Sequence, residues 1–311
     1  MLSNQAKKKL VQSVKGTILF DEVMINHTSF RIGGKADALV IPKDKDDLEN
    51  LLSIINKNSL ELTVIGNGTK LLVGDEGING ITVKISGCFT DIFVKGSKII
   101  AGAGYSLANL STLAAGCGLS GLEFAANIPG TVGGGVVMNA GAHGSMISNI
   151  VTTVTAMCQT GKIKTFSKNV LDFGYRHSVF QNSKDIILSA GLKLEKNRRE
   201  TIKEIMNNYN DWRRKKQPLS MPNAGSIFKN PTDSSAGKLI DVAGLGGFRI
   251  GDAKISEKHA NFIVNLGNAT TNDVLELMNV IKTTVFRKYG VKLVPEIRLI
   301  GRFAKPKSTM N

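Results

Sequence analysis

The chain has 311 residues, of which 42% are hydrophobic, and its formal net charge is +15 at pH 7. No apolar run approaches the roughly 20 residues that a membrane-spanning helix needs, and no signal-peptide core follows the charged N-terminus, so we expect a cytoplasmic protein. Cys88, Cys117 and Cys158 form no CxxC pair, which disfavours a zinc site and favours buried, inert thiols.

The N-terminal half predicts alternating helices and short strands. The first 25 residues indicate an amphipathic helix and a connector, and residues 46–58 place Leu48, Leu51, Leu52 and Ile55 on one helical face. A later helix is expected to begin after Ser106, a good N-cap, and to end near 116–118. Apolar runs and alternation predict strands at 62–66, 81–85, 91–94 and 98–104.

Further strands are expected at 150–157, 162–166 and 185–195, before the composition shifts near residue 196. A long helix then ends near Pro218, with a predicted buried stripe of Ile202, Ile205, Met206, Tyr209 and Trp212. The last elements are a helix from about 272 to 289, capped by Thr271 or Asn272, and a strand at 291–301. Because the strands come in hairpin-like groups, the pattern favours an α+β fold over a doubly wound parallel sheet.

Glycine is concentrated in residues 127–145, NIPGTVGGGVVMNAGAHGS. Glycine permits positive φ and close approach to the backbone, and consecutive amides in such turns bind anions. Two shorter turns, 66–70 and 101–104, could do the same, although each alone is more simply a tight turn without a ligand. None of the three has the spacing G-x-G-x-x-G or G-x-x-x-x-G-K-[ST], so a Rossmann cradle is not supported.

The positive charge has two interpretations, a nucleic-acid-binding face or an enzyme for small anionic ligands. The lysines are spread along the chain, and only four tyrosines and one tryptophan are available for base stacking. No nucleic-acid motif is recognisable, so we favour the enzyme.

The segment 128–144 closely resembles the flavin-pyrophosphate loop of the UDP-N-acetylenolpyruvoylglucosamine reductase family, flavoenzymes of peptidoglycan precursor synthesis. The other matching segments occur in the family's order and extend the resemblance over roughly residues 20–303. They are NHTSFRIGGKADALVIP (26–42), YRHSVF (175–180), NAGSIFKNP (223–231), 243–265 and VPEIRLIG (294–301).

The resemblance implies an α+β fold with a flavin-binding domain of the vanillyl-alcohol-oxidase (PCMH) type. That domain would span 26–196, in subdomains of about 26–85 and 86–196, after an N-terminal helix and connector at 1–25. A substrate-binding α+β domain would follow at 197–303, with a disordered tail at 304–311.

The implied cofactors are FAD and NADPH, the latter as hydride donor. The FAD is expected to be non-covalent, because neither short turn contains histidine. The implied cofactor-binding residues are Gly66, Asn67, Gly68, Thr69, Lys70, Gly102, Gly104, Pro129, Gly130, Thr131, Gly133, Gly134, Asn139, Gly141 and Gly144.

The implied reaction adds hydride from flavin N5 to C3 of an enolpyruvyl group and a proton to C2. Ser226 would donate that proton, while Arg176 and a protonated Glu296 would stabilise the negative charge that develops. Without the resemblance, Ser226 is equally well a turn serine, and Glu296 a solvated strand residue.

The implied partners are small molecules, a UDP-sugar and NADPH, and we expect a monomer that binds neither nucleic acid nor membrane. Arg213, Arg214 and Asn261 are further candidates for the substrate, although the basic run could equally be a solvated helix end. His27, His143 and His177 lack metal-ligand spacing, so we interpret them as structural or incidental and expect no metal. The implied substrate-binding residues are Tyr175, Lys216, Lys229, Asn230 and His259.

Two positions depart from the family pattern, Lys70 for the usual asparagine and Asn127 for a glycine. Lys70 is expected either to pair with a flavin phosphate or to point into water. Arg176 and Ser226 lie only 50 positions apart, so the chain resembles the shorter branch, which lacks an inserted tyrosine loop. Two alternatives remain open, a flavin-dependent oxidase of the same fold and a basic nucleic-acid-binding protein without flavin.

Overall fold

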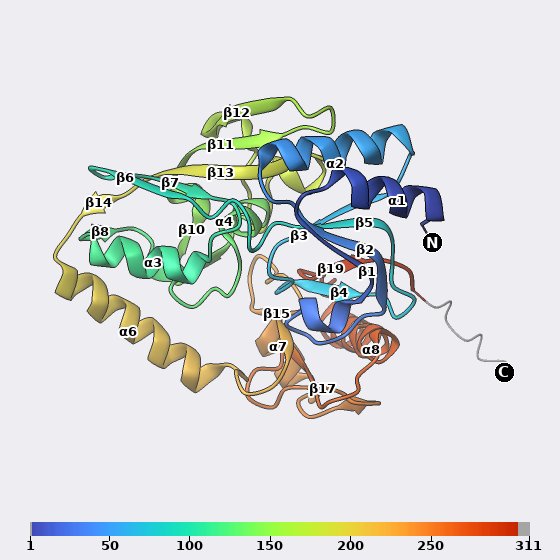
Figure 1. The fold of residues 1–311 in the computed structure, drawn as a ribbon. Helices are drawn as coiled ribbons and strands as arrows, with labels where there is room; N and C mark the ends of the chain where they lie inside the picture. Colours follow the sequence, from blue (N-terminus) through green and yellow to red (C-terminus); the bar gives the residue numbers. More distant parts are fainter. Residues whose placement is uncertain (1, 304–311) are drawn as a thin grey trace. The chain divides into compact units, whose positions relative to one another are not determined.

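The structure, a computed structural model, describes residues 2–303 and divides them into two compact units (Figure 1). Within the described residues, the first unit comprises 2–20, 38–67 and 80–213, and the second comprises 21–37, 68–79 and 214–303. The two units interleave along the sequence, so three strands begin in one unit and end in the other. The domain boundaries expected from the sequence stay a prediction, and the expected tail at 304–311 lies outside the described residues.

One sheet of the first unit has the strand order β1-β2-β5-β3, and helices α1 and α2 pack beside it (Figure 1). Helix α2 buries Leu48, Leu51, Leu52 and Ile55, as predicted, and Asp44 caps it. The predicted connector is wrong in part, because Thr17–Val23 forms the edge strand β1. The elements are α1 (Asn4–Ser13), β1 (Thr17–Val23), β2 (Lys35–Ile41), α2 (Lys45–Lys57), β3 (Leu62–Ile65) and β5 (Ile78–Lys84).

The second sheet of the first unit is antiparallel, with the order β12-β11-β13-β7-β6. Ser106 caps α3 as predicted, and α4 packs against β13 and β7. The strands are β6 (Ile92–Lys95), β7 (Lys98–Gly102), β11 (Val151–Met157), β12 (Ile163–Ser167) and β13 (Ile186–Lys193). The helices are α3 (Leu107–Gly116), α4 (Val132–Val137), α5 (Ile147–Ile150) and α6 (Arg199–Lys216).

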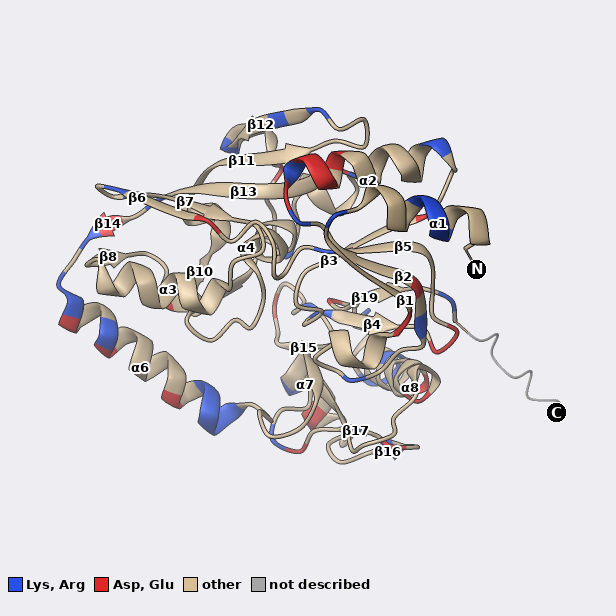
Figure 2. Cartoon of the chain, viewed as in Figure 1, with Lys and Arg blue, Asp and Glu red and all other residues tan. Residues whose placement is uncertain are grey.

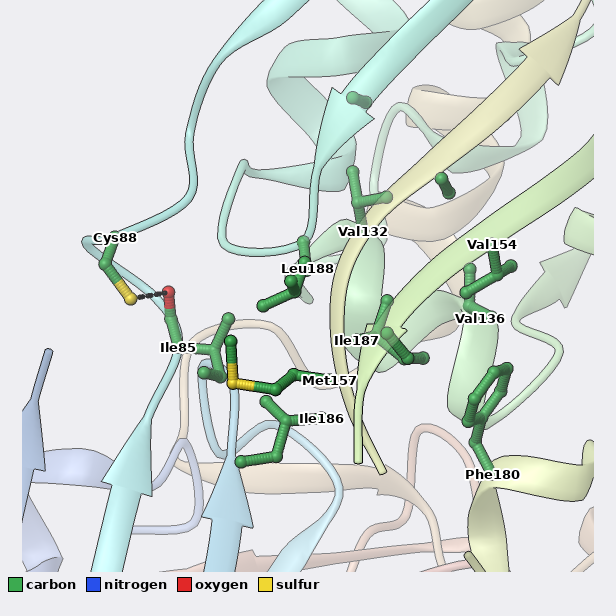
Figure 3. Close-up of a cluster of buried hydrophobic side chains, with 14 of the residues drawn as sticks. Ile85, Cys88, Val132, Val136, Val154, Met157, Phe180, Ile186, Ile187 and Leu188 are labelled. Atoms are coloured by element: carbon green, nitrogen blue, oxygen red, sulfur yellow. Dashed lines mark hydrogen bonds between the residues drawn. The ribbon is translucent and has the colours of Figure 1, made fainter. Parts of the chain in front are cut away.

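Valines of α4 meet the inner face of this sheet in a core that also contains Phe180 and Met157 (Figure 3). Cys88 lies at the edge of this core, where its Sγ donates to the Ile85 carbonyl at 3.2 Å and burial raises the pKa of the thiol to about 12. The prediction of buried thiols holds for Cys88 and is wrong for Cys117, which is exposed.

The predicted stripe of α6 is only partly correct. Ile202 is buried, but Trp212 is 47% exposed, and Ile205, Met206 and Tyr209 are half-buried. Short elements complete the first unit: β8 (Leu119–Ser120) paired with β14 (Glu195–Lys196), β9 (Gly141–Ala142) paired with β10 (Ser145–Met146), and 3-10 turns at Glu123–Ala125, Lys168–Val170 and Val179–Gln181.

The second unit combines an antiparallel sheet, β15-β18-β17-β16, with the parallel pair β19-β4. Helix α8 buries its predicted apolar face, but Thr270 caps it instead of Thr271 or Asn272. The predicted strand at 291–301 is shorter: β19 begins only at Arg298, after an isolated bridge between Pro295 and Phe228. The elements are η1 (Met24–His27), β4 (Leu71–Val73), β15 (Asn223–Ser226), α7 (Ala236–Val242), β16 (Arg249–Ile250), β17 (Ala253–Ile255), β18 (Phe262–Asn265), α8 (Thr271–Tyr289) and β19 (Arg298–Ile300).

Lysine and arginine are distributed over many elements, with a dense group at the C-terminal end of α6 (Figure 2). Within residues 2–303, no helix has both the length and the hydropathy to cross a membrane. The same residues contain no group of three or more histidine, cysteine, aspartate or glutamate side chains placed to hold a metal ion.

Candidate functional site

The glycines at 133–135 let helix α4 lie close to its neighbours. The amide of Gly133 donates to the Ala103 carbonyl at 2.8 Å, and the amide of Gly134 donates to Thr131 Oγ1 at 3.2 Å. A Cβ added at Gly133 would lie 3.0 Å from the Ala103 Cβ, and one at Gly135 would lie 3.1 Å from Leu107 Cδ2. These glycines therefore have a packing role, and their contact with a cofactor stays a prediction.

The turn at 101–104 also has a packing role. A Cβ at Gly102 or Gly104 would collide with the carbonyl oxygens of Phe89 or Cys88. The amide of Gly102 donates to the backbone carbonyl of Asp91, and the amide of Gly104 donates to the backbone carbonyl of Phe89. The structure thus agrees with the simpler interpretation of this turn, and a cofactor contact through Gly102 or Gly104 stays untested.

Two glycine-containing loops of the first unit meet at Asn67 and Pro129. Asn67 Nδ2 donates to the Pro129 carbonyl at 3.0 Å, and a Cβ at Gly66 would lie 2.6 Å from Thr131 Oγ1. Among the described residues, the amides of Asn67, Gly130 and Thr131 have no hydrogen-bond acceptor. Amides in such a loop junction suit an anion, so this part of the loops fits a pyrophosphate.

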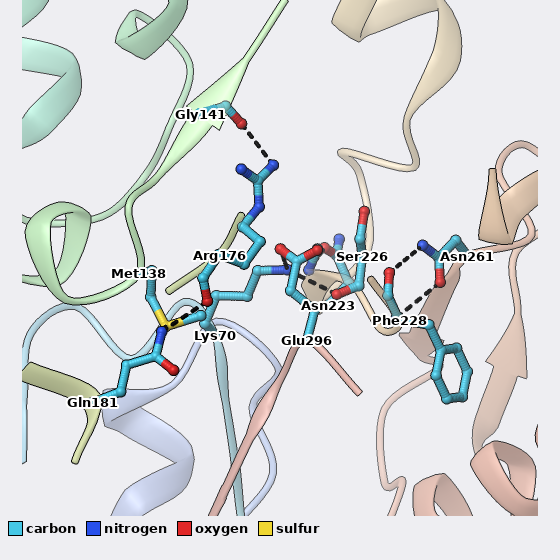
Figure 4. Close-up of polar contacts among 11 residues, drawn as sticks. Lys70, Met138, Gly141, Arg176, Gln181, Asn223, Ser226, Phe228, Asn261 and Glu296 are labelled. Atoms are coloured by element: carbon cyan, nitrogen blue, oxygen red, sulfur yellow. Dashed lines mark hydrogen bonds and ion pairs between the residues drawn. The ribbon is translucent and has the colours of Figure 1, made fainter. Parts of the chain in front are cut away.

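Arg176 lies in a strained turn that is tied to the glycine-rich loop. Its φ is +53°, a value that non-glycine residues rarely adopt unless their surroundings enforce it. Its Nη2 donates to the Gly141 carbonyl at 2.8 Å (Figure 4), and its own carbonyl accepts from Gln181 Nε2 at 2.8 Å. The exposed Tyr175 ring lies 5.0 Å from the guanidinium.

Asn139 makes the second connection between this turn and the loop. Its side chain is 1% exposed and its φ is +42°. The Nδ2 donates to the Gly174 carbonyl at 2.8 Å, and the Oδ1 accepts from the Ser148 amide at 2.9 Å. Asn139 therefore holds the loop to the Arg176 turn, and its predicted contact with the cofactor stays a prediction.

In the second unit, backbone hydrogen bonds bring Lys70, Ser226 and Glu296 together from three distant segments. The amide of Glu296 donates to Ile227, next to Ser226, at 2.7 Å. The amide of Arg298, two residues after Glu296, donates to the Lys70 carbonyl at 2.8 Å. Ser226 ends β15, Lys70 precedes β4, and Glu296 precedes β19, so strand pairing fixes the relative positions of the three residues.

The Lys70 ammonium joins the other two residues (Figure 4). Its Nζ lies 2.8 Å from Glu296 Oε1 and donates to the Ser226 carbonyl at 2.7 Å. The Glu296 side chain is only 6% exposed, and that of Lys70 is 26% exposed. This arrangement differs from both positions expected for Lys70. Glu296 accepts a hydrogen bond from Lys70 here, whereas the resemblance implied that it donates one.

Ser226 follows a turn that sequence reasoning did not assign a function. Asn223 builds this turn: its Oδ1 accepts from the Gly225 amide at 2.9 Å, and its Nδ2 donates to Pro218 and Met221. Gly225 has φ +72°, which a side chain would disfavour. The N-A-G-S sequence was the available signal, since it combines an amide side chain with glycine just before the serine.

Some of the residues of the second unit that were expected to bind the substrate make side-chain hydrogen bonds within the protein. Asn230 Oδ1 accepts from the Ala236 amide, and both ends of the buried Asn261 side chain bond the Phe228 backbone (Figure 4), so Asn261 is structural here. His259 is half-buried, and burial lowers its pKa. Lys229 is half-buried and Lys216 is exposed.

His143, interpreted from the sequence as structural or incidental, forms an aromatic cluster in the first unit. Its ring stacks on Tyr209 of α6 with centroids 3.8 Å apart, and Trp212 contacts it edge-on at 5.3 Å. Burial lowers the His143 pKa. No sequence pattern indicated this contact, because 66 positions separate His143 from Tyr209.

Comparison with known proteins shows similarity along nearly the whole chain. Models of an FAD binding domain and of the UDP-N-acetylenolpyruvoylglucosamine reductase C-terminal domain match residues 36–167 and 217–300. The reductase of Anoxybacillus flavithermus is 45% identical, over 95% of this chain and 98% of the relative. That of Bacillus subtilis is 44% identical, over 94% and 99%.

The crystal structure of UDP-N-acetylenolpyruvylglucosamine reductase from Thermus caldophilus resembles this chain with a TM-score of 0.79. The two are 35% identical, and the match covers 92% of this chain and 99% of the other. Together with the FAD-binding match, this likeness confirms the predicted fold class, a flavin-binding fold with a C-terminal α+β domain.

Proposed function

Because the chain belongs to the UDP-N-acetylenolpyruvoylglucosamine reductase family, we propose that it reduces UDP-N-acetylglucosamine enolpyruvate to UDP-N-acetylmuramate with NADPH and bound FAD. The observation that carries this proposal is 45% identity over 95% of the chain to a reductase of that name. The product is a precursor of peptidoglycan. Its substrates are soluble nucleotides, so we place the enzyme in the cytoplasm, as a monomer that needs neither a membrane nor nucleic acid.

The loops of the first unit are suited to hold the FAD. The amides of Asn67, Gly130 and Thr131 would donate to the pyrophosphate. Gly66 approaches Thr131 closely and has no side chain that could occupy the space beside these amides. When bound, the flavin supplies the hydride for C3 of the enolpyruvyl group. The chain then has to stabilise negative charge and to supply one proton.

We assign the proton to Ser226. Its O–H bond would break as a C–H bond forms at C2, leaving the serine oxygen to be reprotonated from solvent. The turn made by Asn223 and Gly225 and the pairing of Ser226 with Phe262 hold the residue in one position. Such positioning is what a weakly acidic hydroxyl needs to be an effective donor.

We assign stabilisation of the carboxylate and of the developing negative charge to Arg176 and to Glu296 acting together with the Lys70 ammonium that it contacts. A guanidinium keeps its charge and carries five donors, so the bond of Arg176 to Gly141 is compatible with binding a carboxylate. The substrate's diphosphate and sugar would be bound by the remaining candidates, which are Tyr175, Lys216, Lys229, Asn230 and His259.

An absorbance experiment tests this function. The purified protein should be yellow, NADPH should bleach it without oxygen, and enolpyruvyl-UDP-GlcNAc should restore the colour. With Ser226→Ala, bleaching should survive while recovery slows by about 10²-fold or more. Rapid recovery in air alone would indicate an oxidase. A colourless protein with steeply salt-dependent oligonucleotide binding would indicate a nucleic-acid-binding protein.

A further inference from the structure

Lys70 introduces a cation beside two residues to which we assign catalytic roles. At this position the family usually has asparagine, whose side chain is shorter and uncharged. Here the ammonium bridges the Glu296 carboxylate, 2.8 Å away, and the Ser226 carbonyl, 2.7 Å away. The side chain passes over Gly225, where an added Cβ would lie 3.4 Å from Nζ.

The backbone on both sides of this bridge is fixed by strand pairing. Lys70 directly precedes β4, whose partner in the second unit is β19, and Glu296 lies two positions before β19. The amide of Glu296 is also bonded to Ile227, next to Ser226. With both backbones held, the ammonium contacts the carboxylate from a fixed position.

We propose that Lys70 is a positioning residue of the proton-transfer half of the reaction. It orients the Glu296 carboxylate, fixes the end of the turn that carries the Ser226 hydroxyl, and balances the charge of Glu296. This inference rests on the roles proposed above for Ser226 and Glu296.

Charge balance is the physical reason for a cation at this place. The enolpyruvyl substrate carries a carboxylate, and hydride addition to C3 makes the group more negative. A buried glutamate without a counterion would repel that group whenever it is ionised. The other charged residues on or within three positions of β4, β15 and β19 are Lys229, Arg298, Arg302, Asp75 and Glu76, and Asp75 accepts from the Thr271 amide.

The test separates the two half-reactions in Lys70→Met and Lys70→Arg. Lys70→Met keeps the length and apolar stem but removes the charge and the donors. Its flavin should still be bleached by NADPH at close to the normal rate, while recovery with the enolpyruvyl substrate slows by about 10²-fold, as expected when a reacting group is misplaced. Lys70→Arg keeps the charge and should restore most of the recovery rate.

A double-mutant cycle separates action through Glu296 from a merely structural role. If Lys70 acts through the Glu296 carboxylate, which lies 2.8 Å from its Nζ, Lys70→Met should slow recovery much less in a Glu296→Gln background than in the wild-type protein. Equal slowing in the two backgrounds would contradict a role of Lys70 in orienting Glu296.

Flavin content and melting temperature check that each variant is folded. If Lys70→Met fails to fold, Lys70→Gln, which is polar and also removes the charge, carries the test, and slow recovery is again expected. A recovery rate within about threefold of wild type in the variant that folds would overturn the proposal. Normal recovery in Ser226→Ala would instead refute the proton donor and leave the Lys70 result interpretable.

Discussion

Replacing Asn139 by alanine tests how the glycine-rich loop is held to the Arg176 turn. The substitution removes a buried side chain that bonds Gly174 at 2.8 Å and Ser148 at 2.9 Å. Alanine would also have to adopt φ +42° without the side-chain hydrogen bonds that help asparagine to tolerate this conformation. Both effects act on the same loop, so the loss should appear in stability and in flavin binding.

The expected loss can be estimated from these contacts. Gly174 and Ser148 are half-buried, so water can replace part of each lost bond, and each loss costs about 1 kcal/mol. Alanine in the left-handed region adds about 1 kcal/mol. The free energy of unfolding should therefore fall by about 3 kcal/mol, a large share of the stability of an ordinary domain.

Urea denaturation of the flavin-loaded protein measures this loss. Trp212, the single tryptophan, contacts the His143 ring of the loop and serves as the fluorescence probe. Asn139→Gly is the matched control, since it loses the same bonds but tolerates positive φ, and it should be more stable than Asn139→Ala. Wild-type stability in Asn139→Ala, or a glycine variant less stable than the alanine variant, would refute the reasoning.

Three further predictions concern the flavin, the substrate and pH. Gly66→Ala should weaken FAD binding by at least about tenfold, measured by flavin titration, because its Cβ would lie 2.6 Å from Thr131 Oγ1. Arg176→Lys should slow flavin recovery by the enolpyruvyl substrate more than bleaching by NADPH, because lysine lacks the bidentate geometry; equal slowing would contradict this role. Burial lowers the His259 pKa below its ordinary 6.5, so the unfolded chain binds more protons and stability should fall as pH drops through that value. His259→Gln should reduce this fall in urea titrations.

Local periodicity predicted the elements whose apolar faces are covered within a few neighbouring segments. Helix α2 and helix α8 bury the residues that their 3.6-residue pattern selects. Helix α6 has an equally regular stripe, yet Trp212 at its C-terminal end is 47% exposed. Periodicity shows which residues share a face but not whether another part of the chain covers that face.

The candidate site shows the same limit. Sequence motifs suggested Ser226, Arg176 and Glu296 as site residues, which stays a prediction. They did not suggest the contact between Lys70 and Glu296, because it depends on pairing between strands more than 200 positions apart. The glycines in the sequence likewise indicated where another group lies close to the backbone. They could not indicate whether the approaching group is a ligand or protein, as Gly102 and Gly104 illustrate.

The parallel pair of β4 and β19 limits how this protein can be dissected. A fragment covering only residues 217–300, the region of the C-terminal family match, would contain β19 without its partner strand and Glu296 without Lys70. It would also lack Asp75, which binds the first amide of α8. A self-sufficient module for expression, or for transplantation into a chimaera, must therefore carry the excursions Asp21–Asp37 and Gly68–Asn79 along with the C-terminal sequence.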